Sequence, residues 1–150
     1  MHRINASREI AASPDMLWPL IEDFGNIEAW WPRGAPVNIQ RVELEGSGVG
    51  MIRHIFNEGM PAPVSEQLDA LDRDALSWKL SIVGDRPVGL VRYGASGVIT
   101  PLSDSRSRVE YEGEFEAEPG REEEARQFLL GAYELMFDGL AEAAARSGRG

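Results

Sequence analysis

Hydrophobic residues follow two different periods in the first third of the chain. The segment from Arg3 to Ala12 is predicted to be a strand, and apolar residues then recur at helical spacing from Met16 to Phe24. Ser13 and Pro14 precede that run, as an N-cap and a first-turn proline typically do. The pattern therefore predicts a strand and a helix, with at most a short second helix before Pro32.

The middle of the chain, from Val37 to Glu116, alternates apolar and polar residues between turn signals that come at short intervals. This pattern is typical of an antiparallel meander with one apolar and one wetted face. The apolar face is predicted to hold Leu76, Trp78, Leu80 and Ile82, then Val91, Tyr93, Ala95 and Ile99, then Val109, Tyr111, Gly113 and Phe115.

A long amphipathic helix is predicted after Gly120, with one apolar stripe that includes Phe128, Tyr133 and Met136. It runs to about Arg146, and Ser147 to Gly150 are predicted to be a frayed tail. The order of elements indicates an α+β fold in a single domain over residues 1–150. Its curved sheet has seven antiparallel strands, and the last helix covers the concave face.

Glu66 is the exception to the alternation, because it occupies the apolar register between Val64 and Leu68. An unpartnered buried carboxylate costs several kcal/mol, so the position demands a buried cation, a hydrogen-bond network or a wet cavity. A cavity agrees best with the rest of the chain.

Composition narrows the classes of partner. The net charge of −10 and the pI near 4.7 argue against nucleic acid and against anionic membrane surfaces. There is no cysteine, no apolar run of transmembrane length and no apolar signal core in Met1 to Ile10. We expect a cytoplasmic protein without membrane insertion. The residue spacing indicates no metal site and no cofactor.

Short motifs in a fixed order carry a resemblance over nearly the whole chain. They are Ala12 to Trp18, Asp23 to Asn26, Trp30 to Pro32, Gly48 to Gly50 with Arg53, Gly59 to Ala62, and Ser65 to Asp72. The order resembles the helix-grip fold of the START/Bet v 1-like (SRPBCC) superfamily. The similarity is to its polyketide cyclase/dehydrase-like bacterial members and, locally, to the plant abscisic-acid receptors. It implies a cavity between sheet and long helix that takes apolar or amphipathic molecules.

The resemblance implies that Glu66 and Arg53 face this cavity and form its polar anchor. An alternative from the residues alone is that Glu66 is a structural carboxylate paired with Arg53. His54 is interpreted as a surface or satisfied histidine, since only His2 could join it. No lysine occurs in Val37 to Gln40, where the hormone receptors anchor their acidic ligand, so the plant hormone is not the expected ligand.

The other predicted ligand-binding residues are aromatic or methionine side chains: Trp30, Met60, Trp78, Tyr93, Tyr111, Phe128 and Met136. Each tyrosine is equally compatible with ordinary core packing. Two adjacent indoles on a helix point apart, so one of Trp30 and Trp31 is expected inside and the other at the opening. Glu58 to Pro63 resembles the receptors' gate, with Met60 as an exposed plug, and Gly84 to Pro87 takes the place of their latch.

The sequence leaves three functions open. The first is binding of a hydrophobic or amphipathic small molecule of polyketide, lipid or isoprenoid type. The second is a cyclase or dehydratase in which Glu66 is the general acid or base, the one catalytic candidate. The third is a ligand-gated interaction protein, for which a homodimer is one expected assembly.

Overall fold

The computed structural model describes residues 1–149, with side chains as far as Arg146. Seven strands, two α-helices and one 3-10 helix follow one another in the predicted order. They are β1 His2–Ile10, α1 Pro14–Glu22, η1 Phe24–Ala29, β2 Ile39–Glu45, β3 Ile52–Asn57, β4 Val64–Asp72, β5 Ser77–Ile82, β6 Leu90–Ser103, β7 Arg106–Ala117 and α2 Glu122–Arg149.

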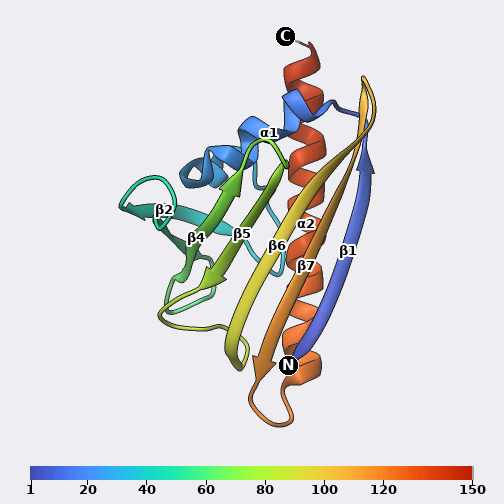
Figure 1. The fold of residues 1–150 in the computed structure, drawn as a ribbon. Coiled ribbons are helices and arrows are strands. Elements are labelled where there is room, and N and C mark those ends of the chain that lie inside the picture. Colours follow the sequence, from blue (N-terminus) through green and yellow to red (C-terminus); the bar gives the residue numbers. More distant parts are fainter. Residues whose placement is uncertain (150) are drawn as a thin grey trace.

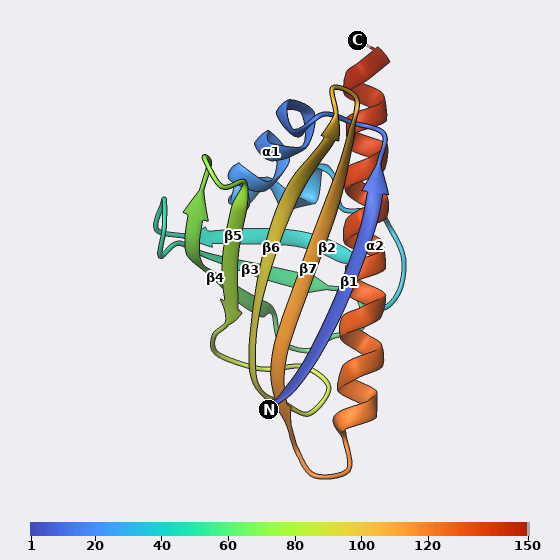
Figure 2. The same cartoon turned by 45° about the vertical axis from the view of Figure 1, so that its right-hand side comes forward.

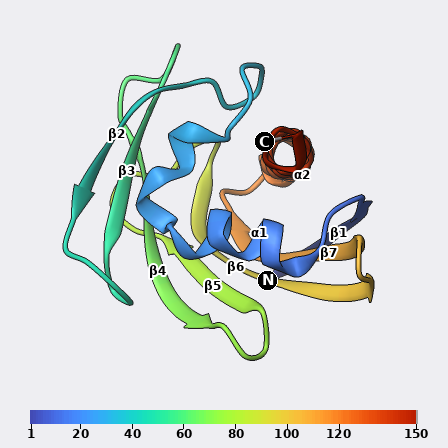
Figure 3. The same ribbon diagram turned by 90° about the horizontal axis from the view of Figure 1, so that it is seen from above.

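All seven strands form one antiparallel sheet in the order β1-β7-β6-β5-β4-β3-β2. The sheet curves strongly, and α2 runs along its concave side (Figure 1). Turned by 45°, β2 and β3 cross the view almost at right angles to β6 and β7 (Figure 2). From above, α2 stands end-on inside the curve, with α1 next to it (Figure 3). The predicted α+β helix-grip architecture is confirmed.

The two short helices form where the sequence predicts a change of period. Pro14 lies in the first turn of α1, and Leu17, Trp18 and Ile21 turn their side chains to the core. Ser13 occupies the N-cap position but makes no side-chain capping hydrogen bond. Beyond Glu22 the chain continues as η1, which is kinked at Asn26. This pair of helices closes one side of the space between the sheet and α2.

One boundary and one register differ from the predictions. The helix α2 continues to Arg149, so the tail expected from Ser147 is helical as far as the structure describes it, and Gly150 lies outside the described residues. Val91 is 48% exposed instead of sharing the buried face with Tyr93. The reason is a register shift between Leu90 and Arg92, which changes the parity of the strand at that point.

The outer surface carries the charge, and the concave side carries the core. None of the described helices has the length and apolar content needed to cross a membrane. The His54 ring lies 2.7 Å from the hydroxyl of Ser65, on the opposite strand face from Arg53, so this histidine is satisfied as expected. The glycine-rich segment Gly46 to Gly50 connects β2 to β3 as a turn.

Candidate functional site

A cavity of about 90 Å³ lies between the sheet and the first half of α2. Every element except β1 contributes to its wall. The lining residues are Leu20, Ile21, Phe24, Ile27, Trp30, Trp31, Val37, Ile39, Arg53, Ile55, Asn57, Val64, Glu66, Trp78, Leu80, Ile82, Tyr93, Tyr111, Phe128, Leu129, Ala132, Tyr133 and Met136.

An ion pair forms the charged part of the wall. Arg53 and Glu66 are directly opposite each other on β3 and β4. Arg53 Nε donates to Glu66 Oε1 at 2.8 Å, and Arg53 Nη2 lies 2.7 Å from the same oxygen. Arg53 Nη1 donates to the carbonyl of Phe24 at 2.9 Å, and the guanidinium stacks 3.7 Å from the centre of the Phe24 ring. The arginine is thus held by three of its donors.

Only one of the two oxygens of the Glu66 carboxylate contacts Arg53. Both contacts from Arg53 reach Oε1, and no hydrogen bond to Oε2 is found among the residues that the structure describes. The Glu66 side chain is 17% exposed, against 8% for Arg53. The site therefore presents one ionised oxygen that can accept a hydrogen bond from a molecule in the cavity.

Three phenols stand around the same space, and they are all the tyrosines of the chain. The hydroxyls of Tyr93 and Tyr133 lie 2.6 Å apart, and the Tyr111 ring meets that of Tyr133 edge to face at 4.7 Å between centres. Burial raises the pKa of each of these phenols, and the negative charge of Glu66 raises it further. At neutral pH all three are protonated and able to donate.

Two further polar atoms in lining residues are buried without a partner among the described residues: Nε1 of Trp30 and Oδ1 of Asn57. Leaving such a group unpaired costs about 1–3 kcal/mol each. Buried polar groups are otherwise almost always satisfied in native structures, so two exceptions in the wall of one cavity need an explanation.

Comparison with known proteins places the chain in a family. A family model described as "Polyketide cyclase / dehydrase and lipid transport" matches residues 1–145. The chain belongs to this family. Among curated proteins the comparison found no match.

Solved structures share the fold of this polyketide cyclase family member over nearly its full length. A point mutant of norcoclaurine synthase from Thalictrum flavum, in complex with a transition state analogue, is 17% identical, with 98% of this chain and 96% of that chain covered and a TM-score of 0.80. The protein XoxI from Bacillus cereus is 25% identical, with 97% and 96% covered and a TM-score of 0.81. A protein from Thermobifida fusca is 24% identical, with 97% and 95% covered and a TM-score of 0.80. The likeness extends over both short helices, the sheet and α2.

The residues predicted from the sequence lie together in this family member, with one exception. Trp30, Arg53, Glu66, Trp78, Tyr93, Tyr111, Phe128 and Met136 all line the cavity. The alternative for Glu66, a pair with Arg53, is also present, so the two interpretations describe the same side chain.

Met60 is the exception, and the prediction of an exposed plug is wrong. Its side chain is half-buried and lies outside the lining of the cavity. The backbone N–H of Met60 donates to the carbonyl of Asn57 at 3.2 Å, which folds the turn back over the end of β3. The sulfur of Met60 consequently lies 3.6 Å from Nδ2 of Asn57.

Trp30 and Trp31 both line the cavity, and Trp30 is 7% exposed whereas Trp31 is half-buried, in keeping with one indole inside and one nearer the surface. Trp30 is the C-cap of η1, and its backbone angles of φ −127° and ψ −6° no longer follow the helix. The rings therefore lie 5.9 Å apart on the same side of the chain. Nε1 of Trp31 donates to the carbonyl of Val37 at 3.0 Å, in contrast to that of Trp30.

Two lining residues with a hydrogen-bonding side chain, Asn57 and Tyr133, were not predicted as part of the site. Asn57 continues the inward register of Arg53 and Ile55 on β3, so its parity was a usable signal. Tyr133 was placed on the buried stripe of the last helix without a role. Its neighbours Leu129 and Met136, one turn away on either side, also line the cavity, and helical spacing predicts that grouping.

Proposed function

We propose that this chain binds one small amphipathic molecule, of polyketide, lipid or isoprenoid type, between the sheet and α2. The observation that carries the proposal is the ion pair of Arg53 and Glu66 among aromatic and aliphatic lining residues. A pair of charges is a poor way to stabilise a core, since well-packed apolar residues of similar volume are often as stable or more so. A polar anchor for a bound molecule accounts for its presence.

The size of the cavity bears on how a ligand enters. At about 90 Å³ it is smaller than the roughly 300 Å³ of a pocket that holds a drug-sized molecule. A larger ligand requires the wall to move. Met136 has an unbranched, adaptable side chain, and Trp31 and Phe128 are only half-buried. We propose that these three side chains make room, together with the turn from Glu58 to Pro63.

A titration with geraniol, an isoprenoid alcohol that does not absorb where tryptophan does, tests the proposal. Three of the four tryptophans line the cavity, so intrinsic fluorescence reports on its occupancy. Ala132→Phe puts a ring into the cavity from α2 and is expected to weaken binding at least tenfold. Ala145→Phe, at an exposed position of the same helix, is the matched control and leaves binding unchanged.

The outcome that contradicts the proposal is equally concrete. If geraniol gives no saturable response, and native mass spectra of the protein purified from its own host show no retained small molecule, the binding function is wrong. If geraniol binds but Ala132→Phe has no more effect than Ala145→Phe, the ligand occupies another site.

A second candidate is catalysis by Glu66 on such a molecule, and one arrangement favours it. One oxygen of Glu66, which has no partner among the described residues, shares the cavity with phenols that remain protonated, which provides a base together with donors for a developing negative charge. Glu66→Gln separates the two functions. A binder loses affinity, by about tenfold for a hydrogen bond to a charged group. An enzyme keeps most of its affinity and loses turnover.

A further inference from the structure

The unpaired polar atoms of the cavity wall indicate which hydrogen-bond donors and acceptors a ligand has to supply. Trp30 and Asn57 are 7% and 3% exposed, so bulk water does not satisfy them. The indole N–H is a donor only. Trp18 and Trp31 show the usual situation, because their N–H groups donate to Glu22 and to the carbonyl of Val37. Nε1 of Trp30 has no such acceptor among the described residues.

The surroundings of Asn57 fix which end of its amide is unpaired. Nδ2 faces the carbonyl of Ile55 at 3.4 Å and the sulfur of Met60 at 3.6 Å, and both of these are acceptors. Turning the amide would bring its oxygen against another carbonyl oxygen, so the N–H end has to stay there. The free group of Asn57 is therefore an acceptor, Oδ1.

The charge of the lining is already balanced. Arg53 is the one cationic side chain among the lining residues, and it is paired with Glu66. An anionic ligand would meet the remaining oxygen of Glu66 without a free cation to offset it. A pure hydrocarbon would leave Trp30 and Asn57 as they are. A hydroxyl group both donates and accepts, and it brings no charge.

We propose that the ligand is a neutral hydroxylated molecule, whose hydroxyl groups accept from Nε1 of Trp30 and donate to Oδ1 of Asn57. Oε2 of Glu66 accepts a further hydrogen bond from the same ligand. This inference rests on the proposed function, since it names the class of molecule for the same cavity. It predicts discrimination against carboxylates and against hydrocarbons of equal size.

Three matched probes test it by isothermal titration calorimetry: 4-ethylphenol, ethylbenzene and 4-ethylbenzoate. We expect 4-ethylphenol to bind at least tenfold more tightly than ethylbenzene, and 4-ethylbenzoate to bind most weakly. Asn57→Leu removes Oδ1 together with Nδ2 from the lining, Trp30→Phe removes Nε1, and both variants have an apolar side chain at that position. Each is expected to reduce the ratio of the affinities for 4-ethylphenol and ethylbenzene several-fold. A change of cavity volume alone would affect both affinities and leave this ratio nearly unchanged.

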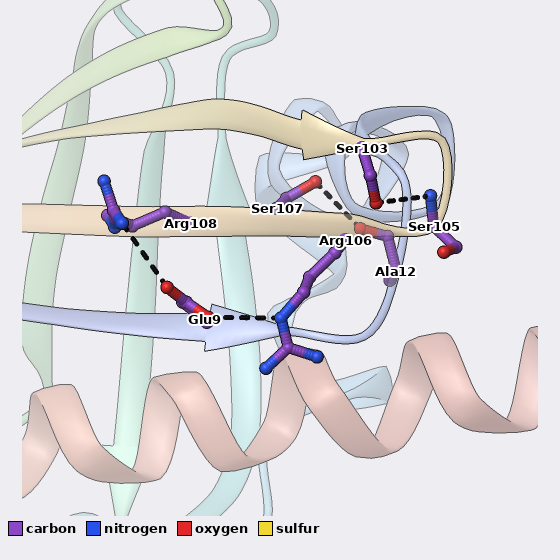
Figure 4. Close-up of polar contacts among 7 residues, drawn as sticks. All are labelled: Glu9, Ala12, Ser103, Ser105, Arg106, Ser107 and Arg108. Atoms are coloured by element: carbon purple, nitrogen blue, oxygen red, sulfur yellow. Dashed lines mark hydrogen bonds and ion pairs between the residues drawn. The ribbon is translucent and has the colours of Figure 1, made fainter.

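Thermal unfolding of the ligand-free variants separates a ligand contact from a structural one. Asn57→Leu removes the unpaired Oδ1 together with the two long contacts of Nδ2, at 3.4 and 3.6 Å, so its Tm loss is expected to be small. Ser107→Ala is the matched control at a buried polar residue with a partner. Its hydroxyl donates to the carbonyl of Ala12 at 2.8 Å (Figure 4), so its removal lowers the Tm.

Two results would overturn the inference. One is equal affinity for 4-ethylphenol and ethylbenzene, or no binding of any of the three probes. The other is a Tm loss in Asn57→Leu as large as in Ser107→Ala together with an unchanged preference, which indicates a buried water as the partner. The geraniol titration decides the binding function separately, so either result leaves that test intact.

Discussion

The space between α2 and the sheet is tightly packed along one part of the helix and contains a cavity along the other. Its later turns pack into the core without a gap: Ile99, Val109, Phe137 and Leu140 are at most 2% exposed, and none of them lines the cavity. Its earlier turns, with Phe128, Leu129, Ala132, Tyr133 and Met136, cover the cavity instead. One helix thus serves as core at one end and as a cavity wall at the other.

Buried polar groups also differ between the two regions in whether they have a hydrogen-bond partner. In the packed region Ser107 is fully buried, and its hydroxyl donates to the carbonyl of Ala12. In the cavity region Trp30 and Asn57 keep an unpaired atom each. Unfilled volume and unsatisfied polar atoms occur together in one region and are both absent from the residues described in the other. That combination is expected where a bound molecule completes the structure.

The largest expected difference between the regions is in the cost of removing a phenylalanine. Phe137→Ala takes a fully buried ring out of the packed region, and we expect it to lower the free energy of unfolding by about 3–5 kcal/mol. Phe128→Ala enlarges a cavity that already exists and removes a half-buried ring, so its cost is expected below about 2 kcal/mol. Urea unfolding of both variants measures the two values. Equal costs would show that the cavity region is as tightly packed as the other.

Alkaline pH is expected to act through the cavity region, because all three tyrosines lie there. The folded protein raises the pKa of each phenol above the ordinary value of 10.0. Above about pH 10 the unfolded chain releases protons that the folded protein retains, so stability is present below that pH and falls as the pH rises. Each phenol contributes about 1.4 kcal/mol per pH unit, or at most about 4 kcal/mol together by about pH 11.

Unfolding by urea at a series of alkaline pH values measures this slope. Tyr111→Phe is the sharpest control, since it removes one phenol and leaves the hydrogen bond between Tyr93 and Tyr133 in place. The loss of stability per pH unit should then shrink by about a third. A tyrosinate absorbance that appears near pH 10 while the protein is still folded would show that the phenols are accessible to water.

How much the sequence could predict also differs between the regions. Alternation along β7 predicted the buried positions of Val109, Tyr111 and Phe115, because that strand runs without a break through the region where it packs. The same rule failed at Val91, where a register shift reverses the parity. Alternation carries information on burial only as long as the strand is regular, and a bulge leaves no clear trace in the sequence.

Many residues of the cavity wall could be predicted from the sequence, but their orientations and hydrogen bonds could not. Glu66 was recognised because a carboxylate in an apolar register is conspicuous, and the resemblance added Arg53. Asn57 was missed because an amide near a turn has an ordinary explanation as a turn residue. Trp30 was predicted to line the cavity, but which of the two indoles lies inside depends on the end of η1, which the sequence does not define to the residue. The unpaired atoms that define the inferred ligand could be found only in the structure.

The smallest expected effect concerns two glycines of β6, one on each side of the boundary between cavity and solvent. Gly97 lies directly opposite Trp78, and a Cβ there would overlap the indole ring that lines the cavity. A Cβ at Gly94 would meet the carbonyl oxygen of Leu80 at 3.7 Å, an ordinary contact. Gly97→Ala is therefore expected to cost about 1–3 kcal/mol through a displaced ring, whereas Gly94→Ala is expected to change stability by about 0.5 kcal/mol or less. Urea unfolding gives the costs, and a fluorescence shift confined to Gly97→Ala shows that the displaced ring is Trp78. If both variants behave alike, the close approach of Trp78 to the sheet does not hold the ring in the cavity wall.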